Sequence, residues 1–434
     1  MARVEANPTG RGRALLLLAL FGLGLACLAM PAAAENGVAT EWVKRYNLQA
    51  NVNDRPIAIG SDGDGNIFVT GSASGEGSYD CLTIKYSPSG RHLWARRYKN
   101  GDAVAMAVDG QGNVLVTLNS GRTGTSWDIA TIKYSPDGKR LWVRRYNGPG
   151  NGTDYASAMT VDGQGNVYVS GSSWGGDTGN NFAIIKYSPN GQRLWVRRPQ
   201  ENARFLAVDS QGNVYVTGVE GDIPTPNSVT VKYSPNGQRL WVRRYYSPKG
   251  FYSPRSLALD GQGNLYVNGL EGIYMTAAFS GTIKYSPDGE QLWEQCTVFG
   301  CEPQAMTVDS QDCVHVIGYN QLFKYNPDGE LLRLNNFSGL FLNALTLDAK
   351  DNAYVTGASW SPESGYDYAT FKYSPEGAEL WARRYNGPGN GNDIAEAVAV
   401  DALGNVYVTG VSEGAATQYD WVTIRYLQSP RMGP

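Results

Sequence analysis

Short apolar runs alternate with polar, glycine-rich turns along most of the chain, a pattern typical of β-strands. In one stretch, runs at 103–108, 114–117, 129–134 and 141–146 are separated by Asp-Gly-Gln-Gly-Asn, a longer link, and a turn that begins Ser-Pro-Asp-Gly. Pro suits a turn because its φ is preset, and Gly suits positions where φ must be positive. The pattern therefore predicts four antiparallel strands, which we name runs A to D in chain order.

This four-run unit repeats along the chain. The Asp that closes run A returns at intervals of 39 to 53 residues, at Asp62, Asp109, Asp162, Asp209, Asp260, Asp309, Asp348 and Asp401. Composition does not change between the eight units, so we expect one domain over residues 39–426 and a short tail, residues 427–434. Four-stranded units of this period are typical of propeller blades, whereas a solenoid would need polar capping units at its ends.

The ends of the repeat indicate how the blades close. Glu41–Tyr46 is a run D with no preceding A, B or C, and the last unit stops after a run C at Trp421–Tyr426. We expect the first strand to complete the last blade and close the ring, which removes exposed sheet edges. The sequence thus predicts an all-β, eight-bladed propeller. Run A should lie inside because its residues are small, and the Trp of run D should pack between adjacent blades.

The repeats carry a family resemblance. The segments 209–218 and 401–410 read Asp-x-x-Gly-Asn-Val-Tyr-Val-Thr-Gly, and Ile-Lys-Tyr-Ser-Pro-Asp-Gly occurs at 132–138. These motifs resemble the bacterial β-propeller repeat family called SBBP over nearly the whole of residues 39–426. The resemblance implies a propeller and an exported bacterial protein, but no activity, because a shared fold does not carry function. The sixth unit departs from the pattern, with Leu332 in place of the run D Trp.

A second resemblance keeps an enzyme among the alternatives. The segment 137–142, Asp-Gly-Lys-Arg-Leu-Trp, is similar to the Trp motif of eight-bladed quinoprotein repeats. That family uses adjacent Cys residues and a metal-bound cofactor in its axial channel, whereas no two Cys are adjacent here. The chain has two His residues and no recognisable nucleophile motif. We therefore favour a non-catalytic binding scaffold without a cofactor; the alternatives are a quinoprotein-type dehydrogenase and a lyase or hydrolase that uses acidic side chains.

The N-terminus has the pattern of a secretory signal peptide. Three Arg residues within the first 13 positions precede an apolar run at 14–30 and small residues up to Ala34. This pattern predicts a signal peptide over residues 1–34, cleavage near Ala34, and a secreted or periplasmic protein. A membrane anchor would need about 20 apolar residues. A lipoprotein signal ending at Cys27 fits less well, because the preceding Leu stands one place too late.

Charge narrows the range of partners. Residues 1–34 hold three Arg and one Glu, so the remaining chain has 34 basic and 39 acidic side chains and a net charge of −5. A mildly acidic chain has no overall field that attracts nucleic acid. We expect a monomer without a membrane span after cleavage, whose partner is a protein, a peptide or a glycan.

Candidate binding residues gather at one end of the predicted blades. The A–B and C–D turns are short and lie at one end, the turn face, while the longer B–C and D–A links form the other end, the loop face. Loops on a rigid scaffold often carry binding residues. The acidic candidates there are Asp54, Asp80, Asp102, Asp128, Asp154, Asp367, Asp393 and Asp420, and the aromatic candidates are Tyr79, Trp127, Trp174, Trp360 and Trp421.

These residue types suit more than one role. Aromatic rings offer flat apolar contact and carboxylates orient hydroxyl groups, which favours a glycan or an extended peptide; clustered carboxylates could also hold Ca²⁺. The alternative is that each Asp accepts backbone N–H bonds and only ties a loop in place. We predict no other metal site. Cys296 and Cys301 should both lie on the loop face, where an oxidising compartment would allow a disulfide.

Overall fold

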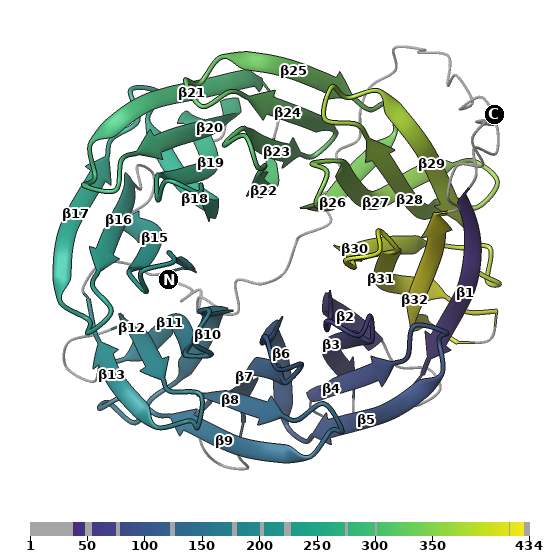
Figure 1. Ribbon diagram of the computed structural model, residues 1–434, viewed down its shortest axis with the longest axis horizontal. Coiled ribbons are helices and arrows are strands. Elements are labelled where there is room, and N and C mark those ends of the chain that lie inside the picture. The colour runs from purple at the N-terminus through teal and green to yellow at the C-terminus, as the bar shows by residue number, and fades with distance from the viewer. Residues whose placement is uncertain are drawn as a thin grey trace, which may run out of the picture. The chain divides into compact units, whose positions relative to one another are not determined.

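The computed structural model describes residues 38–47, 54–74, 79–121, 126–175, 180–199, 204–220, 227–273, 277–299, 302–415 and 417–428. These residues form 32 β-strands, which make eight four-stranded antiparallel sheets arranged as the blades of a ring (Figure 1). The predicted eight-bladed, all-β propeller is confirmed. The predicted signal peptide, residues 1–34, lies outside the described residues, and so do residues 429–434 of the predicted tail.

Each of the first four blades contains four consecutive strands. Blade 1 consists of β2 (Asp54–Ser61), β3 (Ile67–Ser74), β4 (Tyr79–Tyr86) and β5 (His92–Tyr98). Blade 2 consists of β6 (Gly101–Val108), β7 (Val114–Ser120), β8 (Asp128–Tyr134) and β9 (Arg140–Tyr146). Blade 3 consists of β10 (Asp154–Val161), β11 (Val167–Trp174), β12 (Asn180–Tyr187) and β13 (Arg193–Arg197). Blade 4 consists of β14 (Phe205–Val208), β15 (Val214–Glu220), β16 (Asn227–Tyr233) and β17 (Arg239–Tyr245).

The other four blades follow the same order, except that the last one draws a strand from the start of the chain. Blade 5 consists of β18 (Phe251–Leu259), β19 (Leu265–Ile273), β20 (Ala277–Tyr285) and β21 (Gln291–Phe299). Blade 6 consists of β22 (Pro303–Val308), β23 (Val314–Gly318), β24 (Gln321–Tyr325) and β25 (Leu331–Asn336). Blade 7 consists of β26 (Leu340–Leu347), β27 (Ala353–Ser361), β28 (Gly365–Tyr373) and β29 (Glu379–Tyr385). Blade 8 consists of β30 (Asp393–Val400), β31 (Val406–Glu413), β32 (Tyr419–Gln428) and β1 (Val38–Tyr46).

The strands are ordered from the axis outwards as the side chains predict. Run A strands such as β2, β6 and β10 line the centre of the ring, and run D strands such as β5 and β9 form its rim (Figure 1). The Trp of run D packs against rings of its own and the neighbouring blade; the ring of Trp42, for example, lies 6.0 Å from Tyr86 and 6.2 Å from Tyr407. Within the described ranges, the structure contains no helix of the length and apolarity needed to span a membrane.

The Asp of each A–B turn holds that turn together. In blade 3, Asp162 Oδ1 accepts the backbone N–H of Asn166 at 2.8 Å, and its Oδ2 accepts the hydroxyl of Tyr168 at 2.9 Å. In the sixth unit, His315 takes the place of this Tyr and its Nε2 lies 3.0 Å from Asp309 Oδ2. Short turns with an internal carboxylate anchor therefore define the turn face in every blade.

A pair of hydrogen bonds fastens each of six blades to the next one in the ring. Trp142 Nε1 in blade 2 donates to the carbonyl of Pro189 in blade 3 at 3.0 Å, and Lys133 Nζ donates to the same oxygen at 3.3 Å. We call this arrangement the proline latch. Its Trp–Pro bonds recur at Trp42–Pro88, Trp94–Pro136, Trp195–Pro235, Trp241–Pro287 and Trp293–Pro327.

Blade 8 combines strands from the two ends of the described chain. β1 pairs with β32 in antiparallel register, with Val43 opposite Ile424, and β32 extends to Gln428, two residues beyond the expected end of the domain. Trp42 Nε1 and Arg425 Nη1 both donate to Pro88 O, at 3.0 and 2.5 Å, and so latch blade 8 onto blade 1. No turn joins β32 to β1, so among the described residues blade 8 offers blade 7 no proline carbonyl from a C–D turn.

Candidate functional site

Three of the predicted loop-face carboxylates bind arginines of run D. Asp420 accepts Arg45 Nη2 at 2.9 Å, and Asp367 forms an ion pair with Arg384 at 2.7 Å. Asp80 pairs in the same way with Arg97 and also accepts the backbone N–H of residue 100 at 2.8 Å. All three carboxylate residues are buried, so their charge is neutralised within their own blades.

A second set of carboxylates ties the D–A links to the sheets. Asp154 and Asp393 are fully buried and accept the backbone N–H of Gly148 at 2.7 Å and of Gly387 at 2.6 Å. Burial raises the pKa of both carboxyls, although these hydrogen bonds act in the opposite direction. Asp54 is fully buried at the equivalent position of β2. In this geometry the carboxylates hold loops, as the alternative interpretation expects.

Asp102 does not share the position that the sequence pattern gives it. It lies opposite Asn119 in β7, one register position later than the pairing of Asp54 with Ala73 in β3. A one-residue offset turns a side chain to the other face of the sheet. Asp102 accepts Ser72 Oγ of blade 1 at 2.6 Å, so it bridges two blades. Asp128 is half-buried at the start of β8.

The aromatic candidates divide by exposure. Tyr79, Trp174 and Trp360 are exposed to 51%, 40% and 48%. Trp127 is half-buried. Trp421 is only 1% exposed and donates its Nε1 to Thr409 Oγ1 at 3.1 Å, so its ring belongs to the core of blade 8. Three of the five candidates are therefore exposed to solvent over about two-fifths to one half of their surface.

The structure also groups aromatic residues that the sequence pattern did not connect. The rings of Tyr319 and Phe341 meet edge to face with centroids 4.3 Å apart, and Phe341 lies 5.2 Å from Tyr366. Trp360 stands directly opposite Tyr366 in register, which places both side chains on the same side of the sheet. We call these four residues the aromatic strip. It lies on the loop face of blades 6 and 7, and both ends, Tyr319 and Trp360, are exposed.

Sequence reasoning missed Tyr319, Phe341 and Tyr366, since only Trp360 is among the predicted site residues. The available signal was the unusually short B–C link of the sixth unit, where only two residues separate β23 from β24. A short link keeps Tyr319 close to the sheet, and there it meets Phe341 at the entry to the next blade. The predicted acidic residues come from blades 1, 2, 3, 7 and 8, and none comes from blade 6, which supplies Tyr319.

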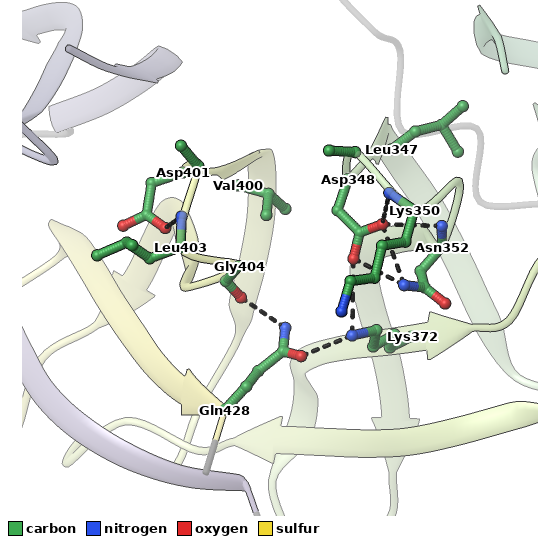
Figure 2. Close-up of a pocket in the computed structure, with 12 residues that line it drawn as sticks. Leu347, Asp348, Lys350, Asn352, Lys372, Val400, Asp401, Leu403, Gly404 and Gln428 are labelled. Carbon is green, nitrogen blue, oxygen red and sulfur yellow. Dashed lines mark hydrogen bonds and ion pairs between the residues drawn. The ribbon is translucent and has the colours of Figure 1, made fainter. Parts of the chain in front are cut away.

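The opposite, turn face carries a hollow of about 420 Å³ between blades 7 and 8 (Figure 2). Gln428 crosses it, with its Oε1 accepting Lys372 Nζ at 2.6 Å and its Nε2 donating to Gly404 O at 2.7 Å. The lining comes from two A–B turns and from β28 and β32: Leu347, Asp348, Ala349, Lys350, Asn352, Lys372, Val400, Asp401, Ala402, Leu403, Gly404 and Gln428.

The charges around this hollow are largely satisfied. Burial opposes ionisation of Asp348, but hydrogen bonds from Asn352 and Tyr354 outweigh it and lower the pKa of that carboxyl. Asp348 Oδ2 also lies 3.7 Å from Lys372 Nζ. The hollow therefore offers a neutral, mixed polar and apolar surface to a ligand.

Metal and disulfide chemistry have little support from the described part of the chain. Across it, no three His, Cys, Asp or Glu side chains converge in a way that could hold a metal ion. Cys301 lies outside the described residues, so its pairing with Cys296 stays a prediction. Cys296 is half-buried, and its burial raises the pKa of the thiol.

Comparison with known proteins agrees with this architecture. The model of the SBBP family, a beta-propeller repeat, matches residues 141–177, which confirms the resemblance seen in the sequence. The structure of BamB from Moraxella catarrhalis aligns with 90% of this chain and 100% of its own, at 12% identity and a TM-score of 0.53. The Dos1 propeller aligns over 91% and 97%, at 8% identity and a TM-score of 0.59. Both likenesses show the fold alone. A search of curated proteins finds no match to the chain.

Proposed function

We propose that the protein is an exported, non-catalytic binding scaffold whose loop face holds an extended peptide segment of a partner protein along the aromatic strip. The observation that supports this proposal is the run of four neighbouring rings from Tyr319 to Trp360, exposed at both ends. Exposed Trp and Tyr side chains are enriched at binding sites because they bury a large apolar area at a small cost in entropy.

The loop-face carboxylates favour a peptide over a glycan as the ligand. A glycan site needs polar groups free to orient sugar hydroxyls, but Asp80, Asp367 and Asp420 are buried and engaged by arginines. Extended peptides instead dock apolar side chains into aromatic-lined grooves. The N-terminal pattern supports export with cleavage near Ala34, so the partner would be met in the periplasm or outside the cell.

A binding screen tests the proposal. A chain that starts at Glu35 would be applied to peptide and glycan arrays, with and without Ca²⁺. We expect peptide binding that Trp360→Ala and Tyr319→Ala each weaken by about 10-fold or more, since Trp and Tyr are the residue types that most often dominate binding energy at interfaces. Leu141→Ser, at an exposed position of β9, is the matched control and should bind normally.

Two results would contradict the proposal. Binding confined to glycans would assign the strip to sugars, and full affinity in Trp360→Ala would remove the strip from the site. Tight uptake of a quinone cofactor with reduction of a dye would instead identify a dehydrogenase, the main alternative in another class.

A further inference from the structure

The junction between blades 7 and 8 lacks one component of the proline latch. At six junctions, a Trp and a basic residue of one blade donate to a single proline carbonyl in the C–D turn of the next blade. Trp381 and Lys372 form the corresponding pair of blade 7, in the same register as Trp142 and Lys133. No C–D turn joins β32 to β1 in blade 8, so this pair has no proline carbonyl as an acceptor among the described residues.

The two donors of blade 7, Lys372 and Trp381, differ in their hydrogen bonding. Lys372 Nζ bonds to the side chain of Gln428 instead of a backbone carbonyl. Trp381 is 6% exposed, and its Nε1 is buried with no hydrogen-bond partner among the described residues. A buried N–H without an acceptor is unfavourable and uncommon in folded proteins. At the six sister junctions the Trp and the basic residue share one proline carbonyl, so that oxygen would lie beside Lys372, which lines the hollow of Figure 2. Trp381 itself is not among the residues that line this hollow.

An exposed leucine marks the rim of the same hollow. Leu403 is 86% exposed in the A–B turn of blade 8 and lines the hollow. The seven equivalent positions are all polar: Asp64, Gln111, Gln164, Gln211, Gln262, Gln311 and Lys350. Lys350, the equivalent residue of blade 7, lines the same hollow, and the apolar side chain of Leu403 opposite it adds contact area for a ligand.

We propose that this hollow is a second binding site, which receives a proline-containing turn of a partner protein in place of the missing C–D turn of blade 8. The proline carbonyl would accept Lys372 Nζ and Trp381 Nε1, with the side chain of Gln428 moved aside. An apolar side chain of the partner would pack on Leu403. The volume of about 420 Å³ is within the usual range for ligand sites. This site is on the face opposite the aromatic strip and goes beyond the proposed function.

A peptide with the chain's own turn sequence provides the probe. The octapeptide Tyr-Ser-Pro-Asp-Gly-Lys-Arg-Leu, copied from residues 134–141, would be titrated into the full chain while the indole N–H signals are followed by ¹⁵N NMR. We expect saturable binding that shifts the Trp381 signal. Trp381→Phe and Leu403→Gln should each weaken binding by about 5–10-fold, the value of one hydrogen bond or one apolar contact.

Matched variants separate this site from general effects on the fold and from the aromatic strip. Trp142→Phe removes the same N–H at an intact latch, so it should lower the melting temperature without changing peptide affinity. The Trp381 indole signal itself distinguishes this site from the aromatic strip, because the strip lies on the opposite face.

Three outcomes would overturn the inference. The first is no saturable binding by the full chain at millimolar peptide, and the second is equal loss of affinity in Trp142→Phe and Trp381→Phe. The third is binding that appears only after residues 429–434 are deleted, because the chain itself would then compete for the hollow.

Discussion

At the scale of single residues, the turn-face aspartates show how a buried charge is kept ionised. Burial opposes ionisation of Asp109, Asp162, Asp309 and Asp348, yet hydrogen bonds from the turn and from neighbouring side chains outweigh it and lower their pKa values. Asp154 and Asp393 on the loop face have fewer donors, and burial raises their pKa values. The same residue type therefore responds to pH in opposite directions at the two faces.

These pKa shifts predict that the folded state becomes less stable in acid. Carboxyls with lowered pKa values stabilise the folded state above their ordinary pKa of about 4, and this stability is lost as pH falls through the folded values. The two carboxyls with raised pKa values act oppositely, because their contribution is greatest at low pH and is lost as pH rises. Since the lowered group is larger, we expect the free energy of unfolding, measured by urea titration, to fall steadily below about pH 4.

Asp309→Asn tests which residues are responsible. Asp309 and Lys324 form a buried pair 2.8 Å apart, and removal of one partner should cost about 3 kcal/mol at pH 7. The variant should also lose less stability than the wild type between pH 4 and pH 2. His315→Tyr, which restores the residue of the sister turns, should stay close to wild type. If Asp309→Asn lost as much stability as the wild type between pH 4 and pH 2, this would contradict the assignment of acid sensitivity to the Asp309 carboxyl.

A second prediction at this scale concerns the tryptophan N–H groups. Trp142→Phe removes a hydrogen bond to Pro189 and leaves its carbonyl with one donor fewer, so we expect a loss of about 1 kcal/mol. Trp381→Phe removes a donor that lacks a partner among the described residues and should be neutral or slightly stabilising. Equal destabilisation of the two variants in chemical denaturation would show that Trp381 Nε1 has an acceptor after all.

At the scale of elements, the C–D turn is shaped to fit under the preceding blade. Gly191 adopts a φ of 77°, and a Cβ added there would lie 2.8 Å from the ring of Trp142. Arg144 Nε of blade 2 donates to the carbonyl of the same glycine at 2.5 Å. The turn is thus both a strand connector and the contact surface for a neighbouring blade.

Gly191→Ala should therefore be costly. Positive φ disfavours any side chain by about 1 kcal/mol, and contact with a packed Trp adds to this, so we expect a loss of about 2 kcal/mol. Gly163 in the A–B turn of the same blade has no heavy atom within 4 Å of an added Cβ. Gly163→Ala should cost less than about 0.5 kcal/mol. Similar melting temperatures for the two variants would argue against the packed turn.

At the scale of the whole molecule, stability depends on how the ring closes. β1 supplies the outer strand of blade 8, and its Trp42 contacts both blade 8 and blade 1. Without β1, the edge of β32 would be open to pairing with other chains. Among the described residues, the junction with blade 7 has no proline latch, so the latch formed by Trp42 of β1 is the one that blade 8 makes.

A chain that begins at residue 47 tests this closure. We expect its melting temperature to fall by about 10 °C or more, since the Trp42 side chain alone contributes about 3–5 kcal/mol. Size-exclusion chromatography should show concentration-dependent self-association. A synthetic peptide of residues 38–46 should restore the monomer and the melting temperature by strand addition. A stable monomer without the peptide would contradict closure by this strand.

The sequence by itself determined the strands, their turns and the number of blades. These features are local, because alternating apolar residues and turn residues such as the Asp and Gly of Asp162–Asn166 act over a few neighbouring positions. Because the sequence unit repeats, the same local fold forms in each of the eight blades. The role of His315 as a substitute for Tyr was predictable for the same reason, since its partner Asp309 is only six residues away.

Only the tertiary structure decided which of the candidate residues are available to a ligand. Arg45 and Asp420 are 375 positions apart, so no local pattern shows that one neutralises the other. The offset of Asp102 arises from strand register, and the aromatic strip arises from contact between two blades. The hollow is lined by the A–B turns of two different blades and by Gln428. Each of these features depends on contacts across the ring, which hydrophobic periodicity along the chain does not encode.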